Sequence, residues 1–179
     1  MKIKIAINGY GRIGRGLHRR ILENSTEDVE VVAINSGSDA NSHAYLLKYD
    51  SIYGKCDADI KVDGKDLMVN GKRTEVFQVR DPKDIDWKKH DVDIVVESTG
   101  KFTEVADVQG HLDAGAKKVL ITAPCSDPKI PNIVMGVNDE DVNLDNYQVL
   151  SNASCTTNCV APVLKVLNET LLCVPRPNI

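Results

Sequence analysis

Apolar residues along the first third of the chain follow two different patterns, which are short continuous runs and a helical spacing. The short isoleucine-rich run Lys2 to Asn8 is followed by Arg12 to Glu23, where apolar residues recur every three or four positions. A second apolar run, Val29 to Ile34, comes next. Neither run alternates strictly with polar residues, which favours parallel strands buried on both faces. The pattern predicts strand, helix and strand, joined by one right-handed crossover.

The middle of the chain carries a different pattern and predicts a small antiparallel insertion. A short helix is expected over His43 to Asp50. Short β-like runs follow, and the dipeptides Asp63-Gly64 and Asn70-Gly71 between them are typical of hairpin turns. The three runs are Ala58 to Val62, Leu67 to Val69 and Glu75 to Val79.

From Val92 onward the parallel pattern returns. A helix is expected over Thr103 to Ala114, closed by Gly115. The strands expected in this part are Asp93 to Glu97, Lys118 to Thr122, Ile133 to Gly136 and Gln148 to Leu150. About six parallel strands with covering helices predict an α/β fold: a doubly wound, mostly parallel sheet of the Rossmann type with a small antiparallel insertion.

Composition and charge exclude several classes of protein. The chain has 179 residues, of which 42% are hydrophobic and 27% charged, and its net charge is −4. We therefore expect no nucleic-acid partner. No apolar run approaches the roughly 18 residues of a membrane span, and no signal peptide is recognisable, so we expect a cytoplasmic protein without a membrane partner. The five cysteines lack paired zinc-ligand spacing, which predicts free thiols and no metal site.

The glycine-rich loop between the first strand and the first helix predicts a dinucleotide site for NAD or NADP. Gly9 permits a tight turn, Gly11 lets the backbone approach a pyrophosphate, and Gly14 lets helix and strand pack closely. The free N–H groups at the start of the helix attract phosphate, and Arg12 adds a positive charge.

The end of the second strand bears on which dinucleotide is bound. A carboxylate at this place usually binds the adenosine ribose and repels a 2′-phosphate, but this chain has Ser36 there. We therefore expect NADP to be accepted alongside NAD or in preference to it. In the alternative, Asp39, three residues further on, takes the place of the carboxylate.

Cys155 is the candidate nucleophile. The segment Ser151 to Cys159 follows a predicted strand and precedes helical spacing over Val160 to Leu171, so Cys155 should lie at or near a helix N-terminus. The backbone donors and the dipole at that place favour the thiolate. Cys159 is expected to be packed one turn deeper, and Pro162 must either begin the regular helix or kink it.

Five segments, in order along the chain, are similar to motifs of the glyceraldehyde-3-phosphate dehydrogenase family. They are Asn8 to Arg15, Leu46 to Ser51, Glu97 to Phe102, Met135 to Asn138 and Ser151 to Cys159, and the similarity covers residues 1 to about 169. The resemblance implies a phosphorylating aldehyde dehydrogenase whose substrates are a sugar-phosphate aldehyde and inorganic phosphate. It also implies a homotetramer.

The resemblance further implies roles for single residues. Cys155 would attack the aldehyde, Ser154 and Thr156 would contact substrate and phosphate, and Arg12 and Ile13 would lie at the pyrophosphate. The rest of the cofactor groove would be lined by Ser36, Arg80, Ser98, Thr99, Gly100 and Thr122. Residues 1–151 would form the dinucleotide-binding domain, and residues 152–179 would begin a truncated catalytic domain.

The sequence departs from the family pattern in two places. NAD-preferring members carry Asp where this chain has Ser36, and the sequence after Glu169 is unlike the family. The general-base histidine of the family would fall just past Ile179. The histidines present lie elsewhere and are expected at the surface or in helices; they are His18, His43, His90 and His111.

These departures leave alternatives open. One is erythrose-4-phosphate dehydrogenase, which performs the same chemistry on a longer sugar phosphate. Another is a catalytically silent module that binds a dinucleotide or a partner. The apolar stretch Val163 to Leu172 would be covered by the rest of the catalytic domain, so we expect the isolated chain to associate.

Overall fold

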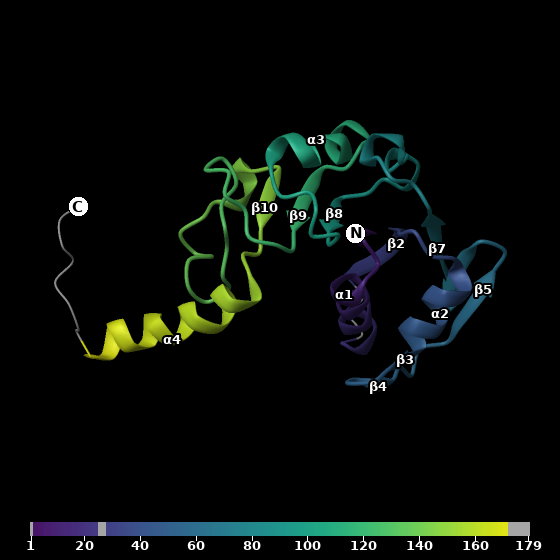
Figure 1. The fold of residues 1–179 in the computed structure, drawn as a ribbon, viewed down its shortest axis with the longest axis horizontal. Helices are drawn as coiled ribbons and strands as arrows, with labels where there is room; N and C mark the ends of the chain where they lie inside the picture. The colour runs from purple at the N-terminus through teal and green to yellow at the C-terminus, as the bar shows by residue number, and fades with distance from the viewer. Residues whose placement is uncertain (1, 25–27, 172–179) are drawn as a thin grey trace.

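The computed structural model describes residues 2–24 and 28–171, which form one large mixed sheet flanked by helices (Figure 1). The strand order in the sheet is β10-β9-β8-β1-β2-β7-β6-β5, and β3 and β4 form a separate antiparallel pair. The strands are β1 Ile3–Asn8, β2 Val29–Asn35, β3 Tyr49–Asp50, β4 Gly54–Lys55, β5 Ile60–Asp63, β6 Asp66–Val69, β7 Lys72–Phe77, β8 Ile94–Glu97, β9 Lys118–Ile121 and β10 Val149–Ser151. The α-helices are α1 Arg12–Glu23, α2 Ala40–Lys48, α3 Val105–Asp113 and α4 Cys155–Leu171, and the 3-10 turns are Pro82–Asp84, Lys88–His90 and Leu144–Asn146.

The six strands from β10 to β7 run parallel, which confirms the predicted doubly wound sheet. β7 differs from the prediction because it belongs to both parts of the sheet. Its residues Glu75 to Phe77 pair in parallel with β2, while Lys72 to Thr74 pair antiparallel with β6. The period of two is the same for either kind of partner, so hydrophobic pattern alone could not show this double role.

The two faces of the sheet carry separate cores. Ala6 and Ala33 face a cluster that includes Val108 of α3, whereas their neighbours Ile7 and Ile34 face a cluster with α1 and α2. Successive strand residues point to opposite faces, so one apolar run supplies both cores. This explains why β1 and β2 read as continuous apolar runs.

Two expected elements are placed differently. α2 begins at Ala40, three residues earlier than predicted, because the carboxylate of Asp39 accepts the N–H of Ser42 and caps the helix. The strand expected over Ile133 to Gly136 is wrong. Only Asn132 bridges to Ser151, and the chain then turns, with the side chain of Asn138 accepting the N–H of Val134.

α4 begins at Cys155, as expected, and continues through Pro162 to Leu171. Its apolar side chains are exposed; they are Val160, Val163, Leu164, Val166, Leu167 and Leu171. The sequence after residue 171, part of the expected catalytic segment 152–179, lies outside the described residues. Within residues 2–24 and 28–171, no helix has the length and apolar character needed to cross a bilayer.

Candidate functional site

A groove of about 670 Å³ lies at the carboxyl ends of the central parallel strands. β2 lies on one side of β1 and β8 on the other, so the direction of winding reverses at β1. Such a switch point is where open α/β sheets bind their ligands. The groove is lined by Asn8, Gly9, Tyr10, Gly11, Asn35, Ser36, Gly37, Val79, Arg80, Ser98, Thr99, Lys101 and Phe102.

The three glycines of the loop are constrained in different ways. Gly9 has a φ of +91°, and a Cβ there would lie 2.6 Å from the amide nitrogen of Thr99. A Cβ on Gly14 would lie 2.4 Å from the carbonyl oxygen of Gly9. At Gly11 a Cβ would meet nothing within 4 Å. Packing within the chain therefore accounts for the first and third glycines but not for the second.

The N-terminus of α1 has no side-chain cap. Gly11 occupies the cap position, whereas Asp39 caps α2 and the hydroxyl of Ser154 accepts the N–H of Thr157 at the start of α4. The first N–H groups of α1 thus remain available to an acceptor at the groove.

Arg12 is engaged away from the groove lining. Its guanidinium pairs with the carboxylate of Asp50 and lies 5.6 Å from the ring centroid of Tyr53. The backbone N–H groups of Tyr53 and Ile52, together with Arg12, lower the pKa of Asp50 to about 2. Ile13 is exposed.

Ser36 lines the groove, whereas Asp39 does not. The carboxylate of Asp39 accepts the N–H of Ser42 at 2.8 Å, and this bond is the largest cause that lowers its pKa. The geometry therefore places a hydroxyl rather than a carboxylate at the end of β2.

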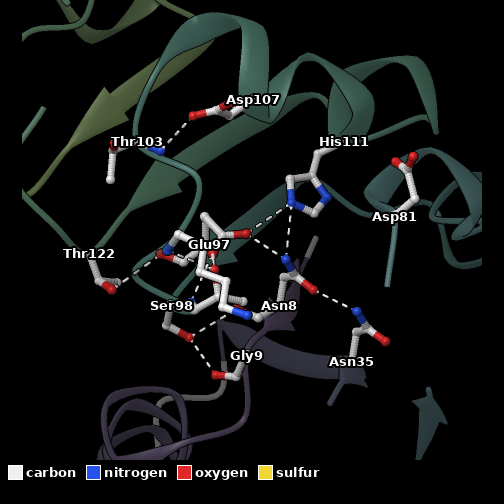
Figure 2. Close-up of polar contacts among 12 residues, drawn as sticks. Asn8, Gly9, Asn35, Asp81, Glu97, Ser98, Thr103, Asp107, His111 and Thr122 are labelled. Carbon is white, nitrogen blue, oxygen red and sulfur yellow. Dashed lines mark hydrogen bonds and ion pairs between the residues drawn. The ribbon is translucent and has the colours of Figure 1, made fainter. Parts of the chain in front are cut away.

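The loop after β8 is fixed to the glycine loop and to β9. The hydroxyl of Ser98 donates to the carbonyl oxygen of Gly9 at 2.6 Å (Figure 2). Both the N–H and the hydroxyl of Thr122 point to the carbonyl oxygen of Glu97. Gly100 has a φ of +73°, a left-handed conformation that favours glycine.

Six of the residues expected at the cofactor line the groove: Gly9, Gly11, Ser36, Arg80, Ser98 and Thr99. Five lie outside its lining: Arg12, Ile13, Gly14, Gly100 and Thr122. Sequence reasoning missed Asn8 and Asn35, which end neighbouring strands in register. The signal was available, because an amide at the end of a buried apolar strand requires a hydrogen-bond partner.

Cys155 is exposed and is the first residue of α4. The turn before it is fixed by Ser151, whose hydroxyl accepts the N–H of Ala153 at 3.0 Å, and Ala153 has a φ of 55°. Thr156 is exposed beside the cysteine. The expectation that Cys159 is packed is wrong, since its thiol is exposed too.

The histidines are not surface residues for the most part. His18, His43 and His111 lie in helices, as expected, but all three are buried. His90 is half-buried and lies 2.8 Å from a carboxylate oxygen of Glu75. Among residues 2–24 and 28–171, no group of three potential metal ligands comes together.

A glycine loop and a groove at the switch point of a doubly wound sheet define a dinucleotide-binding domain. The family model described as the NAD binding domain of glyceraldehyde 3-phosphate dehydrogenase matches residues 3–105. The chain belongs to the glyceraldehyde-3-phosphate dehydrogenase family.

Curated relatives named glyceraldehyde-3-phosphate dehydrogenase align over 169 residues, which is 94% of this chain. The protein of Priestia megaterium is 58% identical, the first of two from Bacillus subtilis 56%, and that of Geobacillus stearothermophilus 53%. The aligned part is 50% of each relative, so the chain spans about half the length of the curated relatives it matches.

Proposed function

We propose that this chain is the cofactor-binding and nucleophile-bearing part of a phosphorylating aldehyde dehydrogenase. The reaction is oxidation of glyceraldehyde 3-phosphate, with NAD or NADP and inorganic phosphate, to 1,3-bisphosphoglycerate. The observation that carries the proposal is the position of Cys155: exposed, at the start of a capped helix directly after β10. Because β10 is parallel to β9, β8 and β1, its carboxyl end lies on the same edge of the sheet as the groove.

The chemistry follows from a thiolate at this place. The sulfur of Cys155 adds to the aldehyde carbon, and the resulting thiohemiacetal loses a proton and a hydride to become a thioester. The nicotinamide of the bound dinucleotide supplies the hydride acceptor. An oxygen of inorganic phosphate then attacks the thioester, so that the C–S bond breaks and the acyl phosphate leaves. Ser154 and Thr156 flank the cysteine and are proposed to orient the substrate.

The groove suits a dinucleotide because it offers free backbone N–H donors and space for a pyrophosphate at the same turn. The uncapped N–H groups at Arg12 and Ile13 are donors, and Gly11 leaves room for a close approach. Ser36, Arg80 and Thr99 supply polar groups along the groove. The proposed assembly is a homotetramer, as the resemblance implies.

An activity assay tests this proposal. The polypeptide that carries this sequence, as its native cells produce it, is supplied with phosphate, NAD or NADP, and either glyceraldehyde 3-phosphate or erythrose 4-phosphate, and reduced nicotinamide is followed by absorbance. We expect turnover with glyceraldehyde 3-phosphate and loss of about a thousandfold or more in Cys155→Ser, since the nucleophile is removed. Binding of the dinucleotide without turnover would favour the silent module. Faster oxidation of erythrose 4-phosphate would favour the other enzyme.

Thiol alkylation gives an internal control within the same helix. Cys155 lies at the N-terminus of α4, whereas Cys159 lies one turn further along the same helix and is also exposed to solvent. We expect iodoacetamide to modify Cys155 at least about tenfold faster, because the helix N-terminus favours the thiolate. Equal rates at the two cysteines, measured by peptide mass spectrometry, would contradict an activated nucleophile.

Ser36 should permit binding of NADP. We expect Ser36→Asp to weaken NADP about tenfold or more while changing NAD binding little, because a carboxylate repels the 2′-phosphate. Asp39→Asn serves as the matched control, since Asp39 caps α2 and does not line the groove. Isothermal titration of both variants with both dinucleotides measures this. If the wild-type chain binds NADP a hundredfold more weakly than NAD, the expectation is wrong.

A further inference from the structure

A buried row of polar side chains crosses the sheet beneath the groove. Asn8 pairs in register with Asn35 on one side and with Glu97 on the other, and all three are the last residues of their strands. Their amides and carboxylate are bonded to one another, as Figure 2 shows from Asn35 through Asn8 to Glu97. His111 of α3 reaches the same carboxylate from the face of the sheet that α3 covers. None of the four is more than 5% exposed.

The orientation of each amide in this row is fixed by its neighbours. The side chain of Asn35 accepts the N–H of Val79 at 2.9 Å and donates to the carbonyl oxygen of the same residue at 2.9 Å. Its nitrogen also donates to Oδ1 of Asn8 at 2.7 Å. Nδ2 of Asn8 therefore points the other way and donates to Oε2 of Glu97 at 2.5 Å.

The opposite end of the row is fixed by a tryptophan. The indole Nε1 of Trp87 can only donate, and it lies 3.0 Å from Nδ1 of His111. Nδ1 therefore accepts, and Nε2 carries the proton that His111 donates to Oε2 of Glu97 at 3.1 Å. The other carboxylate oxygen of Glu97 accepts both the N–H of Thr99, at 2.8 Å, and its hydroxyl.

The row ends on two segments that line the groove. Glu97 holds Thr99 in the loop after β8, and Asn35 holds Val79 in the loop after β7. Each segment is held by two hydrogen bonds to one side chain, and Asn8 joins the two side chains through β1. The separation of these two segments thus depends on a continuous chain of bonds under the floor of the groove.

We propose that this chain of hydrogen bonds sets the width of the dinucleotide groove, and that His111 is a positioning residue that acts on the groove through Glu97. This inference rests on the proposed function, because it assigns the preorganised groove to dinucleotide binding. Loss of the His111 donor leaves a buried carboxylate with one fewer partner and a buried indole N–H without an acceptor. The loop at Thr99 then loses its fixed position, while no group that touches the ligand has been removed.

Paired substitutions at His111 test the proposal. His111→Met removes the donor at similar volume, whereas His111→Gln keeps an N–H donor that can reach Glu97. We expect NAD to bind at least about tenfold more weakly to the Met variant, because this change corresponds to the loss of one hydrogen bond to a charged group. We expect the Gln variant to recover most of the affinity. The dissociation constants are measured with NAD under conditions where every variant is folded, as judged by far-ultraviolet circular dichroism.

Amide hydrogen exchange separates positioning from general destabilisation. Val69→Ala is the matched control, because Val69 is buried in β6 and does not line the groove. We expect His111→Met to accelerate exchange at Thr99 at least about tenfold more than Val69→Ala does, even when the two are equally destabilised.

Each result supports or overturns the proposed role of His111. Wild-type affinity in the Met variant, or equal exchange at Thr99 in the Met variant and Val69→Ala, would overturn this proposal alone. Equal loss of affinity in the Met and Gln variants would overturn the role of the donor. Failure of the unaltered chain to bind NAD would overturn the proposed function together with this inference.

Discussion

Replacement of Gly14 by alanine should both weaken dinucleotide binding and destabilise the chain. The new Cβ would lie 2.4 Å from the carbonyl oxygen of Gly9 and 2.8 Å from Cγ2 of Ile7. Backbone cannot yield as a flexible side chain does, so we expect a loss of about 2–3 kcal/mol in the free energy of unfolding. The displaced glycine loop should weaken NAD binding roughly a hundredfold. Urea denaturation and isothermal titration measure the two effects.

Two other glycines of the same segment provide matched controls. Alanine at Gly11 or at Gly16 meets nothing within 4 Å, and Gly16 lies inside α1. We expect Gly16→Ala to leave NAD binding unchanged and to stabilise the chain by about 1 kcal/mol. Gly11→Ala should change stability by no more than about 1 kcal/mol yet weaken binding about tenfold, because its Cβ projects where the pyrophosphate is proposed to lie. If Gly11→Ala binds NAD normally, the pyrophosphate is not at this turn.

Acidification should destabilise the folded chain in a pH window set by His18. Burial lowers the pKa of His18 from 6.5 to about 4. Burial also raises the pKa of Tyr10 above its usual range, and its hydroxyl forms a hydrogen bond with Nδ1 of His18 at 2.6 Å. A histidine whose pKa is lowered by folding favours the folded state above its unfolded value, and this contribution is lost as the pH falls from 6.5 to 4.

The shift from 6.5 to about 4 corresponds to a loss of about 3 kcal/mol of stability. We expect His18→Gln, which takes up no proton, to lose about that much less than the wild-type chain between these two pH values. Urea unfolding at a series of pH values measures the difference. Parallel pH profiles for the wild-type chain and His18→Gln would contradict the assignment.

The sequence is sufficient to predict most elements of the fold, because their local signals agree with their tertiary environment. The Asn70-Gly71 turn joins β6 and β7 as expected, and both residues have a positive φ. Gly115, with a φ of +103°, ends α3. Such positions depend on the backbone conformation of one or two residues, which composition reveals directly.

Some polar side chains that the sequence offers for solvent or ligand serve the fold instead. Asp39 was considered for a ribose, but it caps α2. His111 lies in a helix, α3, as expected, but the sequence does not show that it is fully buried there. Single-sequence periodicity counts such residues as polar and does not show their partners, which lie 14 or more residues away in Glu97 and Trp87.

β7 pairs with its antiparallel neighbour β6 only over the first half of its length, and Asp66, the first residue of β6, lies where this pairing ends. The carboxylate of this residue is almost fully buried, accepts the N–H of Val76 at 2.9 Å and pairs with Arg73. A backbone donor that a further strand could have used is therefore already occupied by a side chain. β5, at the margin of the sheet, is only four residues long and carries exposed charges at Lys61 and Asp63. Strand-by-strand growth into fibrous aggregates is therefore discouraged on this side of the molecule.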